Sequence, residues 1–351
     1  MLKSKPVNMK LFPYEINGDY RPLDDAVPWN VSLINALTPW PEVVGQAPVI
    51  AVVDTGADIE HPALKDRIFN PINFTSDGPS YDVTDYQGHG THITGTIAGE
   101  GVGCYPGARI MPVKAFAKKT SGWEFQDAFR AILKHNEKAP EADKVVAVNC
   151  SWGGGYDPFL HYLIRRLVNQ GTAVICSAGN AGDGDPETAE IFSWPAFLYE
   201  PITVGAVDSA TLAAKYSSSY DGIDLAAPGS NIYSCWPGGG YKNLSGTSMA
   251  APHVTALVAR IYAAWKEREG HYPTTDEAES VLWRHVRKLD QDERLVGRGM
   301  ADFTYDRKRW PLWRIQMGAY FYTDNADKIK QQLTYLRDRE PSLAVPYKVK
   351  Y

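Results

Sequence analysis

The spacing of apolar residues changes repeatedly along this chain, which predicts alternating strands and helices. Strands that are buried on both faces are apolar at successive positions. Four runs rich in β-branched residues fit that pattern: residues 49–53, 144–150, 172–177 and 202–207. Helical spacing marks stretches between them, residues 91–98, 125–135 and 158–169. The alternation predicts an α/β fold with a doubly wound, mainly parallel sheet and helices on both faces.

A longer helical stretch, residues 247–266, is apolar nearly all round, so we expect it to be a buried central helix. Ser248 lies at its beginning. Pro252 supports this start, because proline is tolerated only near the first turns of a helix.

Both ends of the chain fall outside this alternation. Residues 1–24 are proline-spaced and unpatterned, apart from an apolar island at 11–16. Residues 309–351 predict a strand, a helix and a strand. We therefore expect an N-terminal extension (1–24), a main domain (25–308) and a small C-terminal β-α-β appendage (309–351).

Composition narrows the class of protein. With 351 residues, of which 44% are hydrophobic, the chain can bury a large core. A net charge of −5 without a run of Lys or Arg argues against nucleic acid and membrane surfaces as partners. No stretch approaches the roughly 20 apolar residues of a membrane helix, and the N-terminus lacks the apolar core of a secretory signal. These features predict a cytoplasmic protein whose partners are proteins or peptides.

The four cysteines are widely scattered, and Cys150 and Cys176 fall inside predicted strands. This pattern predicts buried free thiols in a reducing compartment rather than a disulfide framework. A catalytic cysteine is disfavoured, because no histidine accompanies any of them in a recognisable pattern.

Three segments carry the candidate chemistry, in a fixed order along the chain. They are VVDTGAD (52–58), GHGTH (88–92) and SGTSMAAPH (245–253). Alone, each is commonplace: a turn aspartate, a structural histidine and a helix-capping serine. Together they supply a carboxylate, an imidazole and a hydroxyl at element ends, flanked by glycines that allow close approach. Asp54, His89 and Ser248 are therefore candidates for a nucleophilic relay.

This order and these flanks resemble the subtilisin-like serine proteases, and residues 10–307 can be followed against the intracellular subtilisins. The resemblance implies an endopeptidase that works through an acyl-enzyme and needs no cofactor for its chemistry. Ser248 would be the nucleophile, His89 the general base and acid, and Asp54 the group that orients the imidazole. Ser248 would present an exposed hydroxyl at the N-terminus of a helix. The helix dipole would stabilise the negative charge that develops beside this hydroxyl. A homodimer is compatible with the sequence.

The same resemblance implies roles for other segments. Asn180, within residues 177–182, matches the asparagine of the oxyanion hole. The family's substrate-flanking segments match Thr120, Ser121, Gly122, Ser151, Trp152, Gly153, Ser177, Ala178 and Gly179. Trp152 stands where the family commonly has Leu, which predicts that its ring narrows the floor between neighbouring side-chain pockets.

The apolar island near the N-terminus looks like the inhibitory motif of intracellular subtilisins. Its residues are Leu11, Phe12, Pro13 and Tyr14, with Phe12 in place of the usual Ile. The resemblance implies that residues 1–24 lie across the active site and that the proline displaces the scissile bond. A tethered pseudo-substrate acts at high effective concentration, so modest affinity suffices. The alternative is that this segment is a strand that docks on a neighbour without inhibiting.

Two cation sites of the family give different expectations. At the first, the sequence His61-Pro62-Ala63-Leu64 lacks the usual aspartate, and residues 98–103 form a short turn in place of a loop. We therefore expect the strong calcium site to be absent. A second site, made of carbonyls and a carboxylate, could hold structural calcium or sodium. Its residues would be Ala196, Leu198, Pro201 and Asp224.

Rival functions fit the residues less well. His89 and His92 are three apart with no Glu between them, unlike the pair on a zinc-protease helix. An esterase of the α/β-hydrolase type needs Gly-x-Ser-x-Gly and the order Ser, Asp, His. A catalytically silent scaffold that keeps the fold for recognition stays open, although the complete set of candidate residues counts against it.

The C-terminal appendage resembles the opening of sporulation-related peptidoglycan-binding (SPOR) repeats. The similarity lies in residues 313–320, followed by Asn325, Ala326 and a predicted helix. Only about half of such a domain fits in residues 309–351, and a unit this small is marginal alone. It implies either peptidoglycan binding by the tail or a packing appendage.

Overall fold

The computed structural model describes residues 5–18, 27–41, 47–117, 120–188 and 193–306. The predicted β-α-β appendage and its likeness to a peptidoglycan-binding repeat lie outside these residues.

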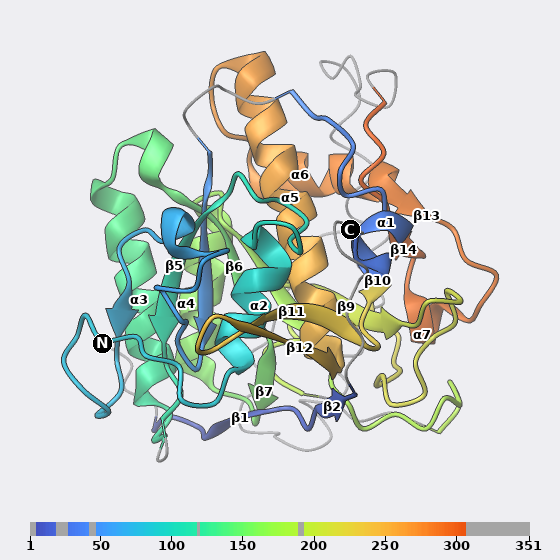
Figure 1. The fold of residues 1–351 in the computed structure, drawn as a ribbon, viewed down its shortest axis with the longest axis horizontal. Coiled ribbons are helices and arrows are strands. Elements are labelled where there is room, and N and C mark those ends of the chain that lie inside the picture. The colour runs from blue at the N-terminus through green and yellow to red at the C-terminus, as the bar shows by residue number, and fades with distance from the viewer. Residues whose placement is uncertain (1–4, 19–26, 42–46, 118–119, 189–192, 307–351) are drawn as a thin grey trace, which may run out of the picture.

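A nine-stranded sheet forms the centre of the described chain (Figure 1). Its order is β13-β14-β10-β9-β8-β6-β3-β5-β4, and only the β13–β14 pair is antiparallel. The strands are β3 (Val49–Asp54), β4 (Ile72–Asn73), β5 (Arg109–Lys114), β6 (Val145–Cys150), β8 (Ala173–Ser177), β9 (Ile202–Val207), β10 (Leu225–Pro228), β13 (Val286–Arg287) and β14 (Met300–Ala301). The chain runs from β3 to β5 on one side and then to β6 on the other, as a doubly wound sheet requires.

Helices cover both faces of this sheet. The long helix α5 (Thr247–Glu269) and α2 (His89–Ala98) pack on one face, and α3 (Trp123–Lys138) and α4 (Pro158–Asn169) pack on the other. Alternate residues of β3 explain the arrangement, because successive side chains of a strand point to opposite faces. Ile50 and Val52 join the core cluster of α2 and α5, and Val49, Ala51 and Val53 join that of α3 and α4. The predicted fold class is confirmed.

Shorter helices complete the described chain. They are α1 (Trp29–Leu33), α6 (Thr275–Leu282), α7 (Glu293–Val296) and the 3₁₀ turns Lys65–Arg67, Glu141–Asp143 and Trp283–His285. Within the described residues, no helix is both long and apolar enough to cross a membrane.

The N-terminal extension, whose sequence shows no periodic pattern, forms two strands. β1 (Met9–Leu11) pairs antiparallel with β7 (Trp152–Gly154), and β2 (Glu15–Asn17) pairs antiparallel with β12 (Gly240–Ser245). β12 forms a hairpin with β11 (Ile232–Trp236). Figure 1 shows β1, β2 and β7 along one edge of the molecule. These strands arise from pairing with their neighbours, so their own sequence gives no periodic signal.

Candidate active site

The carboxyl ends of adjacent parallel strands bring the candidate residues together. Asp54 is the last residue of β3, Ser151 follows β6 directly, and Asn180 follows β8 by three residues. This edge is where open α/β sheets place their ligand sites.

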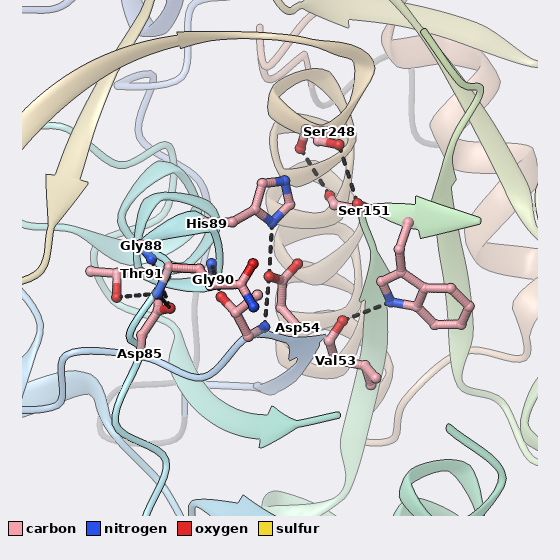
Figure 2. A network of polar contacts seen from close by, with 12 residues as sticks. Val53, Asp54, Asp85, Gly88, His89, Gly90, Thr91, Ser151 and Ser248 are labelled. Carbon is pink, nitrogen blue, oxygen red and sulfur yellow. Dashed lines mark hydrogen bonds and ion pairs between the residues drawn. The ribbon is translucent and has the colours of Figure 1, made fainter. Parts of the chain in front are cut away.

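Asp54 and His89 form a close, fully buried pair (Figure 2). His89 begins α2, and its Nδ1 lies 2.8 Å from Asp54 Oδ1. The same oxygen accepts the Thr55 N–H at 2.8 Å. Gly90 permits this approach, because a Cβ there would lie 2.1 Å from the Gly56 carbonyl oxygen. The structure thus brings these two candidate residues into direct contact.

Asp85 anchors the start of the helix that carries His89, and our sequence reading missed it. Its carboxylate accepts the N–H groups of Gly88 and Thr91, each at 2.8 Å, and the Thr91 hydroxyl at 2.8 Å (Figure 2). The available signal was an aspartate shortly before a predicted helix, where a carboxylate can accept the free N–H groups of the first turn, although Asp85 lies three residues before the N-cap Gly88.

Ser248 lies in the first turn of α5 and is fully buried, not exposed as expected. Its hydroxyl donates to the Ser151 carbonyl at 3.1 Å (Figure 2). In the described part of the chain, His89 Nε2 has no hydrogen-bond partner. The N-terminal extension passes beside this end of α5, because its Pro13 carbonyl bonds to Asn180, which in turn accepts the Thr247 N–H.

Pro252 explains one of the two hydrogen bonds between Ser151 and Ser248. Proline has no N–H, so it cannot satisfy the carbonyl of Ser248, four residues earlier. The Ser151 hydroxyl donates to that carbonyl instead, at 2.9 Å. The helix carrying Ser248 is therefore tied to the segment that leads into β7.

Asn180 is held with its amide nitrogen facing the cleft. Its Oδ1 accepts the backbone N–H and the hydroxyl of Thr247, at 2.8 and 2.7 Å. Its Nδ2 donates to the Pro13 carbonyl at 2.6 Å. Thr247, which our sequence reading did not single out, thus sets which way the amide points.

The predicted substrate-flanking segments contact the N-terminal extension through backbone atoms. Leu11 lies opposite Trp152, and Lys10 lies opposite Gly153. At Gly122 a Cβ would lie 2.5 Å from the Val7 carbonyl oxygen, so the extension passes close to that loop. Thr120 and Ser121 make side-chain hydrogen bonds within their own loop, to Ala117 and Glu124 respectively.

The Phe12 side chain occupies a pocket beside β7. A Cβ at Gly153 would lie 2.5 Å from Phe12 Cζ and 2.2 Å from Ser193 Oγ, and one at Gly179 would lie 3.7 Å from Phe12 Cε1. Ser177 and Ala178 are fully buried just before Gly179, and the Ala178 N–H donates to the Val204 carbonyl at 3.0 Å. These residues hold the pocket wall at the end of β8.

Trp152 makes its contacts in the protein core. Its indole N–H donates to the Val53 carbonyl at 2.7 Å, and its ring packs against Phe125 with centroids 4.5 Å apart. The side chain is fully buried. The ring is therefore held by β3 and α3, in the same core cluster as Met9 of the extension, and the narrowed pocket floor stays a prediction.

Beyond Pro13, the extension covers the imidazole and continues along β12. The Tyr14 ring centroid lies 5.1 Å from that of His89. Burial raises the pKa of the Tyr14 hydroxyl, and the negative charges of Asp54 and Asp85 raise it further. The Ser245 hydroxyl donates to Asn17 Oδ1 at 2.5 Å, and Asn243 Nδ2 donates to the Gly18 carbonyl at 3.0 Å.

The other histidines near the site are packing residues. Loss of hydration on burial lowers the pKa of His92 to about 3 and that of His253 to about 4, so both stay neutral. His92 Nε2 lies 2.9 Å from the Ile232 carbonyl, and His253 Nε2 lies 2.8 Å from Asn30 Nδ2. Across the described ranges, no cluster of three or more His, Cys, Asp or Glu side chains could hold a metal ion.

Two of the four residues proposed for a structural cation, Ala196 and Asp224, have oxygens that accept hydrogen bonds within the protein. The Ala196 carbonyl accepts the Thr203 hydroxyl at 2.5 Å, and Asp224 Oδ2 accepts the Thr203 N–H at 2.8 Å. A carbonyl can accept twice, so these residues fit a cation only alongside Thr203. Calcium or sodium at this place stays a prediction, as does the absence of the strong calcium site near Ala63.

All four cysteines are buried and free, as predicted. Burial raises the pKa of Cys104 and of Cys235 to about 12, which leaves both as unreactive thiols.

Most of this chain is similar in sequence to known proteins. Residues 45–299 match the model of the subtilase family. An intracellular serine protease of Paenibacillus polymyxa is 36% identical over 91% of this chain and 98% of its own length. The major intracellular serine protease of Bacillus subtilis is 36% identical over 84% of this chain and 93% of its own. A subtilisin of a Bacillus species is 31% identical over 68% of this chain and 62% of its own. The chain therefore belongs to the subtilase family of serine endopeptidases.

Proposed function

We propose that this endopeptidase uses Asp54, His89 and Ser248 as its triad and is made as a self-inhibited precursor. Ser248 Oγ would attack the peptide carbonyl while His89 Nε2 takes its proton, and Asp54 would stabilise the imidazolium. Three observations support these roles. Asp54 and His89 lie 2.8 Å apart, His89 Nε2 has no hydrogen-bond partner within the described residues, and Ser248 lies in the first turn of α5. Proton transfer requires the hydroxyl to turn from the Ser151 carbonyl to Nε2.

Asn180 and the backbone N–H of Ser248 would stabilise the tetrahedral intermediate. The Asn180 amide is held by Thr247 and already donates to a peptide carbonyl, that of Pro13. A donor fixed in place before reaction stabilises developing charge without reorganising.

The observation that carries the self-inhibition proposal is a mismatch of one residue. The side chain in the pocket beside Gly153 belongs to Phe12, but the carbonyl on Asn180 belongs to Pro13. A cleavable peptide presents its pocket side chain and its reacting carbonyl from the same residue. The extension would therefore bind as a substrate does while holding its Phe12 carbonyl away from the donor.

We also propose that the protein works inside the cell. Two relatives that are matched over 98% and 93% of their own length are named intracellular serine proteases. Four buried cysteines without a disulfide fit a reducing compartment.

Peptide-amide hydrolysis by three proteins tests the proposal: the full chain, a chain beginning at Asp19, and that shortened chain with Ser248→Ala. We expect the shortened chain to be much faster than the full chain, and the Ser248→Ala variant to lose activity by orders of magnitude. The matched control is Ser280→Ala, which removes a hydroxyl on α6 that donates to the Glu277 carbonyl. It should keep full activity.

Each outcome separates the two halves of the proposal. Equal rates for the full and shortened chains would exclude inhibition by the extension. Unchanged activity after Ser248→Ala would exclude the triad. Circular dichroism and the thermal unfolding midpoint verify that each protein is folded.

A further inference from the structure

Trp152 connects the strand that pairs with peptide to the strand that carries Asp54. It begins β7, whose backbone pairs with β1 of the extension, and its indole N–H donates to the Val53 carbonyl at 2.7 Å. That carbonyl belongs to the peptide bond between Val53 and Asp54. The contact therefore acts one bond away from the aspartate that holds His89.

The hydrogen bond lies where the sheet itself stops joining these segments. Pairing between β3 and β6 ends at Val52 opposite Asn149, after which the chain leaves β6 and turns into β7. Beyond that point no ladder bond between β3 and β6 is made. The indole adds a bond one residue further along β3, across the opening between the two segments.

The indole is rigidly placed. It is fully buried, and its ring contacts Phe125, Phe116 and Phe129 with centroid separations of 4.5, 6.4 and 6.4 Å. A ring packed on several sides cannot tilt without displacing its neighbours. Movement of β7 relative to β3 would thus break the hydrogen bond and disturb this packing together.

We propose that Trp152 is a positioning residue that fixes the distance between peptide bound on β7 and the Asp54–His89 pair. The role of Asp54 rests on the proposed function, whereas the pairing of peptide with β7 rests on the contacts of β1. Trp152 then matters for substrates that extend far enough before the scissile bond to pair with β7. A substrate with a single residue before that bond does not use the connection.

The test is a ratio measured in the full-length chain. For each variant, kcat/KM is determined for a tetrapeptide anilide and for a single-residue ester with the same residue at the cleaved bond. At low substrate concentration the fraction of chains with an open cleft cancels in this ratio, so any inhibition by the extension does not affect it.

Trp152→Phe removes the indole N–H and keeps an aromatic ring. We expect the tetrapeptide to ester ratio of kcat/KM to fall about tenfold, through a fall in the ratio of the two kcat values and with the ratio of the two KM values changed less than twofold, because a misaligned peptide still binds. The kcat for the ester should change less than twofold. Trp40→Phe is the matched control, since the Trp40 indole also donates to a backbone carbonyl at 2.7 Å, that of Phe303, away from β7. Its ratio should equal that of the unaltered chain.

A second variant keeps the inference testable if Trp152→Phe does not fold. Phe125→Leu leaves the indole N–H in place but removes the ring that packs closest to it, and we expect the ratio to fall about threefold. An unchanged ratio in both variants, an equal fall for the two substrates, or the same fall in Trp40→Phe would overturn the proposal. If Ser248→Ala loses activity on both substrates while the ratio for Trp152→Phe is unchanged, the triad assignment stands and only the proposed role of Trp152 is rejected.

Discussion

The two halves of the extension lie on different surfaces and are held by different kinds of contact. In the β1 half, Met9 and Phe12 are only 4% and 6% exposed, and Phe12 fills the pocket beside Gly153. In the β2 half, Ile16 is 61% exposed, and the contacts are backbone pairing with β12 and the hydrogen bonds around Asn17. Pro13 lies at the junction, with its carbonyl on Asn180.

This difference shows where affinity and alignment should come from. Buried apolar side chains contribute most of the free energy of binding, whereas hydrogen bonds that replace those to water contribute less. The β1 half should therefore supply the strength of the inhibitory contact. The β2 half should hold the direction of the chain past His89, and the junction should decide whether the extension is cleaved.

The largest effect should come from the junction. Pro13→Ala in the full-length chain restores a backbone N–H and frees φ, so the Phe12 carbonyl can reach Asn180 while its side chain stays in the pocket. We expect cleavage after residue 12 to be at least about 100-fold faster, since a misplacement of about 1 Å costs on that order. Intact mass over time measures it.

Two controls identify the cause of that cleavage. The double variant Pro13→Ala, Ser248→Ala should stay intact, and Pro6→Ala should leave the rate unchanged because Pro6 lies away from Asn180, beside Gly122. A Pro13→Ala chain that hydrolyses peptides but keeps its own extension would contradict the one-residue mismatch.

The next effect should come from the β1 half. Removing the buried Phe12 ring costs about 1.5–3 kcal/mol, so Phe12→Ala in a peptide of residues 5–18 should weaken inhibition about 10- to 150-fold. The inhibition constant against the shortened chain measures this. Lys10→Ala is the control, because Lys10 is exposed between two inward-facing neighbours. Similar losses for both peptides would mean that the pocket does not dominate.

The sequence predicted the parts of this molecule that carry their own pattern. The strands β6, β8 and β9 lie within one residue of the predicted runs, because a strand buried on both faces is apolar throughout. β5 was not predicted, since Pro112 and charged ends interrupt its apolar run. Two-residue strands such as β4 and β13 exist only through their partners, so no local signal marks them.

The candidate site also has contacts that the sequence predicted and contacts that it did not. The Asp54–His89 contact followed from two motifs at element ends. The orientation of the Ser248 hydroxyl did not, because it depends on the Ser151 carbonyl nearly a hundred positions away in sequence. The direction of Trp152 depends on which side of β7 faces α3, which one short strand cannot reveal.

A smaller effect should come from the β2 half. Asn17→Ala removes the hydrogen bond from Ser245, a loss of about 0.5–1.5 kcal/mol, so the same peptide should inhibit about 2- to 10-fold less well. Ile16→Ala is the control and should change inhibition less than twofold, because that side chain is exposed. If Asn17→Ala weakened the peptide as much as Phe12→Ala, the proposed difference between the halves would not hold.

The smallest effect is a pH dependence at Tyr14, where the chain passes over His89. Its pKa is raised above the ordinary 10.0 in the docked state, so docking favours the neutral phenol. Affinity should be constant below pH 10 and fall as pH rises through 10, because a free phenolate must take up a proton to dock. Between pH 8 and pH 10.5 the unaltered peptide should lose more affinity than the Tyr14→Phe peptide, at most about fourfold more. Comparing the two peptides on one enzyme cancels the pH dependence of catalysis, and equal losses would mean that the phenol stays hydrated when the extension is bound.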